Sequence, residues 1–75
     1  MKELLEYIAR NLVDYPDDVR VEQKGNEDSI VLELHVHEND MGKVIGRQGR
    51  IAKSIRSVMK AAASKNNVKV SVDIV

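Results

Sequence analysis

The sequence predicts an α+β fold in which helices cover one face of a three-stranded sheet, in the order α-β-β-α-α-β. Three observations lead to this prediction. Two long segments repeat apolar residues at helical spacing, three segments alternate apolar and polar residues, and a short apolar segment precedes a pair of glycines. Each strand then has one apolar face and each long helix one apolar stripe, so stacking the helices on one face of the sheet buries all of them.

The first part of the chain predicts a helix followed by a hairpin. Apolar residues recur at helical spacing over 2–12, and Pro16 disfavours helix at the residue before it. Alternation over 19–22 and 29–37 predicts two strands, which turn residues at 24–28 join. In the second strand, one face is apolar and the other carries the following residues: Val31, Glu33, His35 and His37.

The next segment predicts a helical turn, a glycine-containing interruption and a long helix. Asn39 or Asp40 is a candidate N-cap for a helical turn over 41–45. Residues 46–49 interrupt it, and helical spacing resumes over 51–62. On this second helix the basic residues fall on the side opposite the apolar stripe: Lys53, Arg56 and Lys60.

The end of the chain predicts the third strand. Lys65, Asn66 and Asn67 close the long helix, and residues 68–74 alternate between apolar and polar side chains.

Length and composition predict one soluble domain, spanning residues 1–75. A chain of this size buries only about 60% of the surface that its unfolded form exposes, so its core is thin. The chain has no cysteine, which excludes disulfides and thiolate metal sites. Because no signal peptide and no membrane-spanning apolar run is present, we expect a cytoplasmic protein that does not contact membranes.

The formal charge of the whole chain is zero, but the charges are divided along it. Residues 1–40 carry four basic and eleven acidic groups. Residues 41–65 carry no acidic group and seven basic ones: Lys43, Arg47, Arg50, Lys53, Arg56, Lys60 and Lys65. Since polyanion binding needs a local basic patch rather than a high overall charge, this segment indicates a nucleic-acid ligand.

The most informative motif is Val44-Ile45-Gly46-Arg47-Gln48-Gly49-Arg50-Ile51, in which two glycines bracket two polar residues between helical segments. Glycine permits a sharp turn and a close approach of phosphate to the backbone. Gly49 also stands at the start of a helix, where free N–H groups and the helix dipole favour an anion. The motif supplies no nucleophile or general base, so it predicts binding rather than catalysis.

These residues match the KH signature V-I-G-x-x-G-x-x-I, except that the last spacing is shorter. With the opening helix and the block Ala52-Lys53-Ser54-Ile55-Arg56, nearly the whole chain resembles the short bacterial single-KH proteins of the KhpA family. The resemblance implies the type II, prokaryotic KH fold and a cytoplasmic RNA chaperone and post-transcriptional regulator, often linked to cell shape. It also implies a homodimer, or a heterodimer with a larger Jag-type KH protein (KhpB).

The resemblance also implies a binding site for single-stranded RNA. The loop residues Gly46, Arg47, Gln48 and Gly49 would hold phosphates, because KH loops of this kind clamp about four nucleotides. Electrostatic support would come from Lys43, Arg50 and Lys53. Ile45 and Ile51 would line an apolar groove for bases, although Ile51 fits the core equally well, and for Ile55 the core is the better interpretation.

Other constellations predict no further chemistry. His35 and His37 share a strand face, and Glu33 is the one further candidate ligand; we interpret the two histidines as an exposed surface pair and expect no metal site. The glycines fit neither a dinucleotide fingerprint nor a P-loop, and the serines lie in no nucleophile motif. We therefore expect no enzymatic activity, cofactor or small-molecule substrate.

A second class of function stays open. The apolar stripe of the long helix could extend into a subunit interface, which would make the chain a protein-interaction module with weak or secondary RNA binding. These residues do not determine which RNA sequence is preferred. They also do not determine whether RNA is bound in preference to single-stranded DNA.

Overall fold

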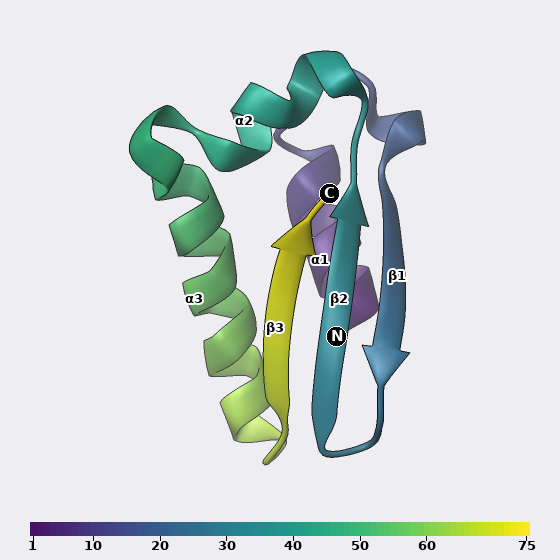
Figure 1. The fold of residues 1–75 in the computed structure, drawn as a ribbon, viewed down its shortest axis with the longest axis vertical. Coiled ribbons are helices and arrows are strands. Elements are labelled where there is room, and N and C mark those ends of the chain that lie inside the picture. Colours follow the sequence, from purple (N-terminus) through teal and green to yellow (C-terminus); the bar gives the residue numbers. More distant parts are fainter.

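The computed structural model describes all residues, 1–75, and has the predicted α+β architecture (Figure 1). The helices are α1 (Lys2–Arg10), α2 (Met41–Ile45) and α3 (Arg50–Lys65). The strands are β1 (Arg20–Gly25), β2 (Ser29–His35) and β3 (Lys69–Ile74). The order α-β-β-α-α-β is thus confirmed, and three short 3₁₀ turns lie in the connections.

The sheet has the strand order β1-β2-β3. β1 and β2 form the expected antiparallel hairpin, whereas β3 pairs with β2 in parallel, with Leu32 opposite Val72. A parallel pair needs a long crossover connection, and α2, the glycine loop and α3 supply it. β2 is therefore the central strand, and it is the most regularly alternating one, with Ile30, Leu32 and Leu34 buried.

Several element boundaries differ from prediction. β1 continues to Gly25, through residues that the sequence assigned to a turn, because Gly25 pairs with Ile30 and the φ of Gly25 is +99°. The real turn is narrower, and the Asn26 side chain closes it by accepting bonds from the N–H groups of Asp28 and Ser29. β2 ends at His35 rather than at residue 37, since the 3₁₀ turn follows closely.

The core lies between the sheet and the helices. Its fully buried side chains include Leu5 from α1, Leu32 and Leu34 from β2, and Met59 from α3. α1 lies behind the sheet, and α3 runs beside β3 (Figure 1). The opposite face of the sheet has no helix over it and carries the polar side chains of each strand. No helix combines the length and apolar character needed to cross a membrane.

Candidate nucleic-acid interface

The loop between α2 and α3 has a backbone that requires glycine at its first position. Gly46 has φ +76° and ψ 174°. A Cβ at Gly46 would lie 2.6–2.9 Å from side-chain atoms of Ile51, which is closer than packed atoms approach. Ile51 therefore fills the space where a side chain at residue 46 would sit, and this contact fixes the path by which the chain leaves α2.

The second half of the loop is left-handed. Gln48 has φ +58°, and Gly49 has φ +72°. The Gly49 N–H donates to the Gly46 carbonyl at 3.1 Å and closes the turn. Nothing lies within 4 Å of a Cβ placed on Gly49, so the demand for glycine there is conformational only. The turn holds Arg47 and Gln48 exposed at its tip.

The N-terminus of α3 faces the same loop. Gly49 occupies the N-cap position, no side chain caps the helix, and its first turn contains no acidic residue. Arg50 and Lys53 lie in that turn and are exposed. α3 has 16 residues, so the positive end of its dipole and its first N–H groups are presented beside three cationic side chains, the third being Arg47.

The basic residues of the segment 41–65 are almost all free of ion pairs. Lys43 is the exception, because its Nζ contacts the Asp14 carboxylate and lies 3.6 Å from Asp40 Oδ1. These contacts raise the pKa of Lys43, the hydrogen bond to Asp14 being the largest cause. The other six have no carboxylate within 4.0 Å: Arg47, Arg50, Lys53, Arg56, Lys60 and Lys65. Lys43 is thus the least available of the predicted RNA-binding cations.

Asp40 anchors the base of α2 and is the buried charged residue of the domain. Its carboxylate accepts bonds from the N–H groups of Asp14 at 3.2 Å and Tyr15 at 3.0 Å. Burial raises the pKa of Asp40, but these two bonds and nearby Lys43 outweigh it, so the pKa lies below its usual value. The prediction of a helix cap was partly wrong. Asp40 occupies the N-cap position of α2, but its side chain makes no capping bond there and binds the loop before β1 instead.

A shallow groove runs between α3 and β3, and sequence reasoning gave its residues no role. It has a volume of about 340 Å³ and is lined by α3 through Arg56 and Lys60 and by residues 70–73 of β3. The Arg56 Nε donates to the Val72 carbonyl at 3.1 Å, at the outer edge of the strand. A signal for this groove was present in the sequence, because both residues sit on the basic side of α3, but the parallel placement of β3 was needed to recognise it.

The predicted apolar residues lie elsewhere. Ile51 lines a second groove, between α1 and α3, and Ile55 reaches it from the core, where it is 3% exposed. Ile45 is half-buried and packs against the core. Ile51 is therefore separated from the groove beside β3, and it supports the loop through its contact with Gly46.

The two histidines are not the exposed surface pair that we expected. Both are half-buried, and they make different contacts. His37 stacks on Tyr15 with ring centroids 4.1 Å apart, and its Nδ1 accepts a bond from the Asn39 N–H at 3.0 Å. The imidazole of His35 lies on the open face of the sheet near two glutamates, and its Nε2 is buried without a hydrogen-bond partner.

Comparison with known families decides the assignment. Residues 2–74 match the family model described as KhpA/KhpB, KH domain. The chain belongs to this family. The type II KH fold is thereby confirmed.

Curated relatives match the KH domain over its full length. The RNA-binding protein KhpA of Clostridium perfringens is 63% identical over 75 residues, covering 100% of both chains. The protein of the same name from Clostridium acetobutylicum is 61% identical, also over 100% of both chains. That of Halalkalibacterium halodurans is 56% identical over 100% of this chain and 99% of its own. These relatives are named as RNA-binding proteins and not as enzymes, in agreement with the prediction of no enzymatic activity.

Solved structures confirm the fold alone. Aquifex aeolicus Era bound to GDP·AlF4⁻ superposes with a TM-score of 0.71 at 19% identity, over 99% of this chain and 30% of that one. A structure of Era with MgGDPNP and nucleotides 1506–1542 of 16S ribosomal RNA gives a TM-score of 0.70 at 20% identity, over 97% of this chain and 28% of that one.

Proposed function

We propose that this KH domain binds single-stranded RNA, with phosphates held by the loop Gly46–Gly49 and the N-terminus of α3. The observation that carries the proposal is the uncapped start of α3, which lies beside exposed Arg47, Arg50 and Lys53, none of them in an ion pair. The positive end of the α3 dipole and unpaired cations around one turn form a site for an extended polyanion. The names of the relatives support RNA as that polyanion.

From the loop, the bases of the bound RNA would extend along the groove between α3 and β3. β3 is an edge strand, so its outer N–H and C=O groups are not used by another strand. Such groups can bond to the Watson–Crick edges of unpaired bases, while Arg56 and Lys60 follow the sugar-phosphate chain. We therefore assign contacts with the bound RNA to Arg56 and Lys60 rather than to Ile45 and Ile51. Those two isoleucines pack against the core, and Ile51 also lines the groove beside α1.

One such domain contacts about four nucleotides, so we expect modest and permissive affinity. That behaviour suits an RNA chaperone or post-transcriptional regulator in the cytoplasm, which must release its ligand readily. Lys43 would contribute least, because Asp14 and Asp40 already engage it.

The test is a fluorescence anisotropy titration of labelled, mixed-sequence single-stranded RNA against Arg47→Asp/Gln48→Asp. Aspartate tolerates the left-handed backbone at residue 48, so the change adds negative charge without straining the turn. The matched control is Arg20→Asp/Gln23→Asp, which makes the same charge change at exposed positions of β1. We expect the loop variant to lose at least about tenfold in affinity and the control to bind like wild type, with thermal melts confirming that both fold. Equal binding by the loop variant and wild type would refute the loop as the phosphate site.

A second candidate function is self-association or pairing with a larger KH protein. Four large apolar side chains with exposed fractions of 37–68% surround the groove between α1 and α3: Leu4, Tyr7, Leu12 and Val58. This groove has a volume of about 560 Å³ and an almost wholly apolar lining. Apolar patches of this kind mark interfaces, and this one lies apart from the groove beside β3, so one protein could use both.

Light scattering at high protein concentration tests this second candidate. We expect a dimer that Val58→Glu converts to a monomer, and that Ser57→Glu, an exposed neighbour outside the groove, leaves intact. A wild-type chain that stays monomeric and does not bind a Jag-type KH protein would exclude this function.

A further inference from the structure

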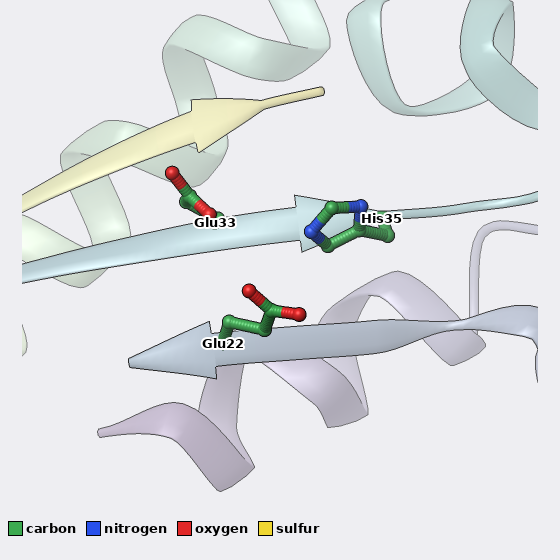
Figure 2. Close-up of side chains that lie close together, drawn as sticks. All are labelled: Glu22, Glu33 and His35. Atoms are coloured by element: carbon green, nitrogen blue, oxygen red, sulfur yellow. The ribbon is translucent and has the colours of Figure 1, made fainter. Parts of the chain in front are cut away.

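The open face of the sheet carries a cluster of three metal-ligating side chains that RNA binding does not use. Glu22 extends from β1, and Glu33 and His35 extend from β2, on the face away from the helices (Figure 2). One carboxylate oxygen from each glutamate and one ring nitrogen of His35 all lie within 4.8 Å of one another. Because strands in a paired register are rigid, their backbones hold these three groups in place.

His35 supplies the observation that points to a ligand. Its Nε2 is fully covered and has no hydrogen-bond partner, whereas buried polar atoms in folded proteins nearly always have one. The imidazole is held beside two carboxylates without a bond that would explain its position. A cation placed between the three groups would satisfy the nitrogen.

The placement of Glu22 and Glu33 opposite each other is a second observation that points to a cation. Glu22 and Glu33 are directly opposite in the antiparallel register, and like charges at such positions destabilise a sheet. Flanking cations offset this repulsion in part, with Lys24 Nζ 3.1 Å from Glu33 Oε1 and an Arg20 nitrogen 3.5 Å from Glu22 Oε1. A carboxylate has two oxygens, so these ion pairs do not prevent either group from ligating a metal.

We propose that Glu22, Glu33 and His35 form a binding site for a first-row transition-metal dication, with Zn²⁺ as its representative. An imidazole with two carboxylates suits Zn²⁺ and its neighbours in the series, whereas Mg²⁺ and Ca²⁺ take oxygen ligands. Tetrahedral bonds of about 2.0–2.1 Å put ligand atoms about 3.3 Å apart, so the most distant groups must close by up to about 1.5 Å. Rotation of Glu22, whose side chain is 44% exposed, supplies this movement and opens the approach to Nε2.

The bound cation would join β1 to β2. The site is on the opposite side of the sheet from α1 and the core, so it is independent of the proposed RNA loop. Metal binding would strengthen the hairpin without occupying the groove beside β3.

Isothermal titration of untagged protein with Zn²⁺ at neutral pH, in a buffer that does not chelate metals, tests the proposal. We expect one saturable site per chain, a rise in Tm on loading, and at least about a tenfold loss of affinity in both His35→Gln and Glu33→Gln. His37→Gln is the matched control and should bind like wild type. Arg20→Gln/Lys24→Gln, which removes the competing cations, should bind more tightly.

The outcomes separate the site from a general acidic patch. Absence of saturable Zn²⁺ binding by wild type would overturn the proposal. Equal affinity of wild type and His35→Gln, or equal stabilisation by Mg²⁺ and Zn²⁺, would also overturn it, because the imidazole would then have no role. If His35→Gln fails to fold, the His35 ring resonances of wild type decide by NMR: they must shift on adding Zn²⁺, and unchanged resonances would refute the site.

Discussion

The basic residues of the first region, 1–40, are mostly in ion pairs, whereas those of the second region, 41–65, are mostly unpaired. On residues 1–40, three of the four basic side chains contact carboxylates: Arg10 with Glu6, Arg20 with Glu22, and Lys24 with Glu33. On residues 41–65, only Lys43 does so. The first region satisfies its charges internally, whereas the second leaves six cations facing water around an uncapped helix.

This difference indicates where an external ligand is needed. Like charges concentrated on α3 repel one another, and nothing within the domain relieves that repulsion. A bound polyanion would relieve it. Acidic residues elsewhere bring the net charge to zero, which gives the whole chain no general attraction to nucleic acid and confines binding to one surface.

Substitution of Gly46 should destabilise the loop that carries these cations. We expect Gly46→Ala to cost about 2–4 kcal/mol of unfolding free energy, since its Cβ would meet Ile51 and its backbone is left-handed. Gly49→Ala has open space around the Cβ and the milder left-handed helical conformation, φ +72° and ψ 17°, and should cost about 1 kcal/mol. Urea denaturation of the two variants measures the difference, and equal costs would show that the Ile51 contact does not matter.

Asp40 binds the segment before β1 and also pairs with Lys43 of the second region. We expect Asp40→Asn to lower Tm at pH 7 by roughly 5–10 °C, because an amide oxygen cannot serve both N–H groups as a carboxylate does. The pKa of Asp40 is lower in the folded chain, so its stabilisation is complete above its ordinary value of 3.8 and is lost as pH falls from there through the folded pKa. Melts from pH 7 to 2 should therefore show the gap between wild type and variant closing in acid, and a gap that widens there would contradict this sign.

Salt should distinguish the unpaired cations from the paired ones. With about three phosphate contacts, log K should fall with log salt at a slope near −2, so RNA affinity drops about sixteenfold between 50 and 200 mM salt. Lys60→Gln should weaken binding a few-fold and reduce that slope by about 0.7, whereas Lys24→Gln, at a cation already paired with Glu33, should change neither. Anisotropy titrations at three salt concentrations measure both quantities, and a flat salt response would rule out phosphate contacts.

The smallest effect is expected for an ion pair of the first region, on α1. Arg10→Gln removes an exposed i,i+4 contact with Glu6 and should cost no more than about 0.5 kcal/mol in urea denaturation. RNA affinity should stay unchanged. A marked loss of RNA binding in this variant would remove the contrast between the two regions.

Periodicity was sufficient to predict α1, α3 and the three strands, because amphipathic patterns at spacing 3.6 and 2 reflect burial directly. The short α2 was predicted from the candidate caps Asn39 and Asp40 instead. It could not give the strand order, since the parallel pairing of β3 with β2 depends on how the crossover packs. For that reason Arg56 and Lys60 were not recognised as the wall of a groove. The role of Asp40 was also hidden, because its partners are the backbone N–H groups of residues more than twenty positions away.

The loop was the part of the candidate site that could be read most directly. Positive φ at Gly46 and Gly49 fits the sharp turn expected from the two glycines, whereas the positive φ of Gln48 was not predictable from its residue type. The placement of Ile51 was not predictable, because its side chain turns toward α1 and Gly46 rather than toward β3.

The most direct test of the central claim is a ¹H–¹⁵N NMR titration of the wild-type domain with a short single-stranded RNA. We predict that amide shifts concentrate at Gly46–Lys53 and along the facing edges of α3 and β3, while β1 stays unchanged. Shifts confined to the hairpin, or to the apolar groove between α1 and α3, would contradict it.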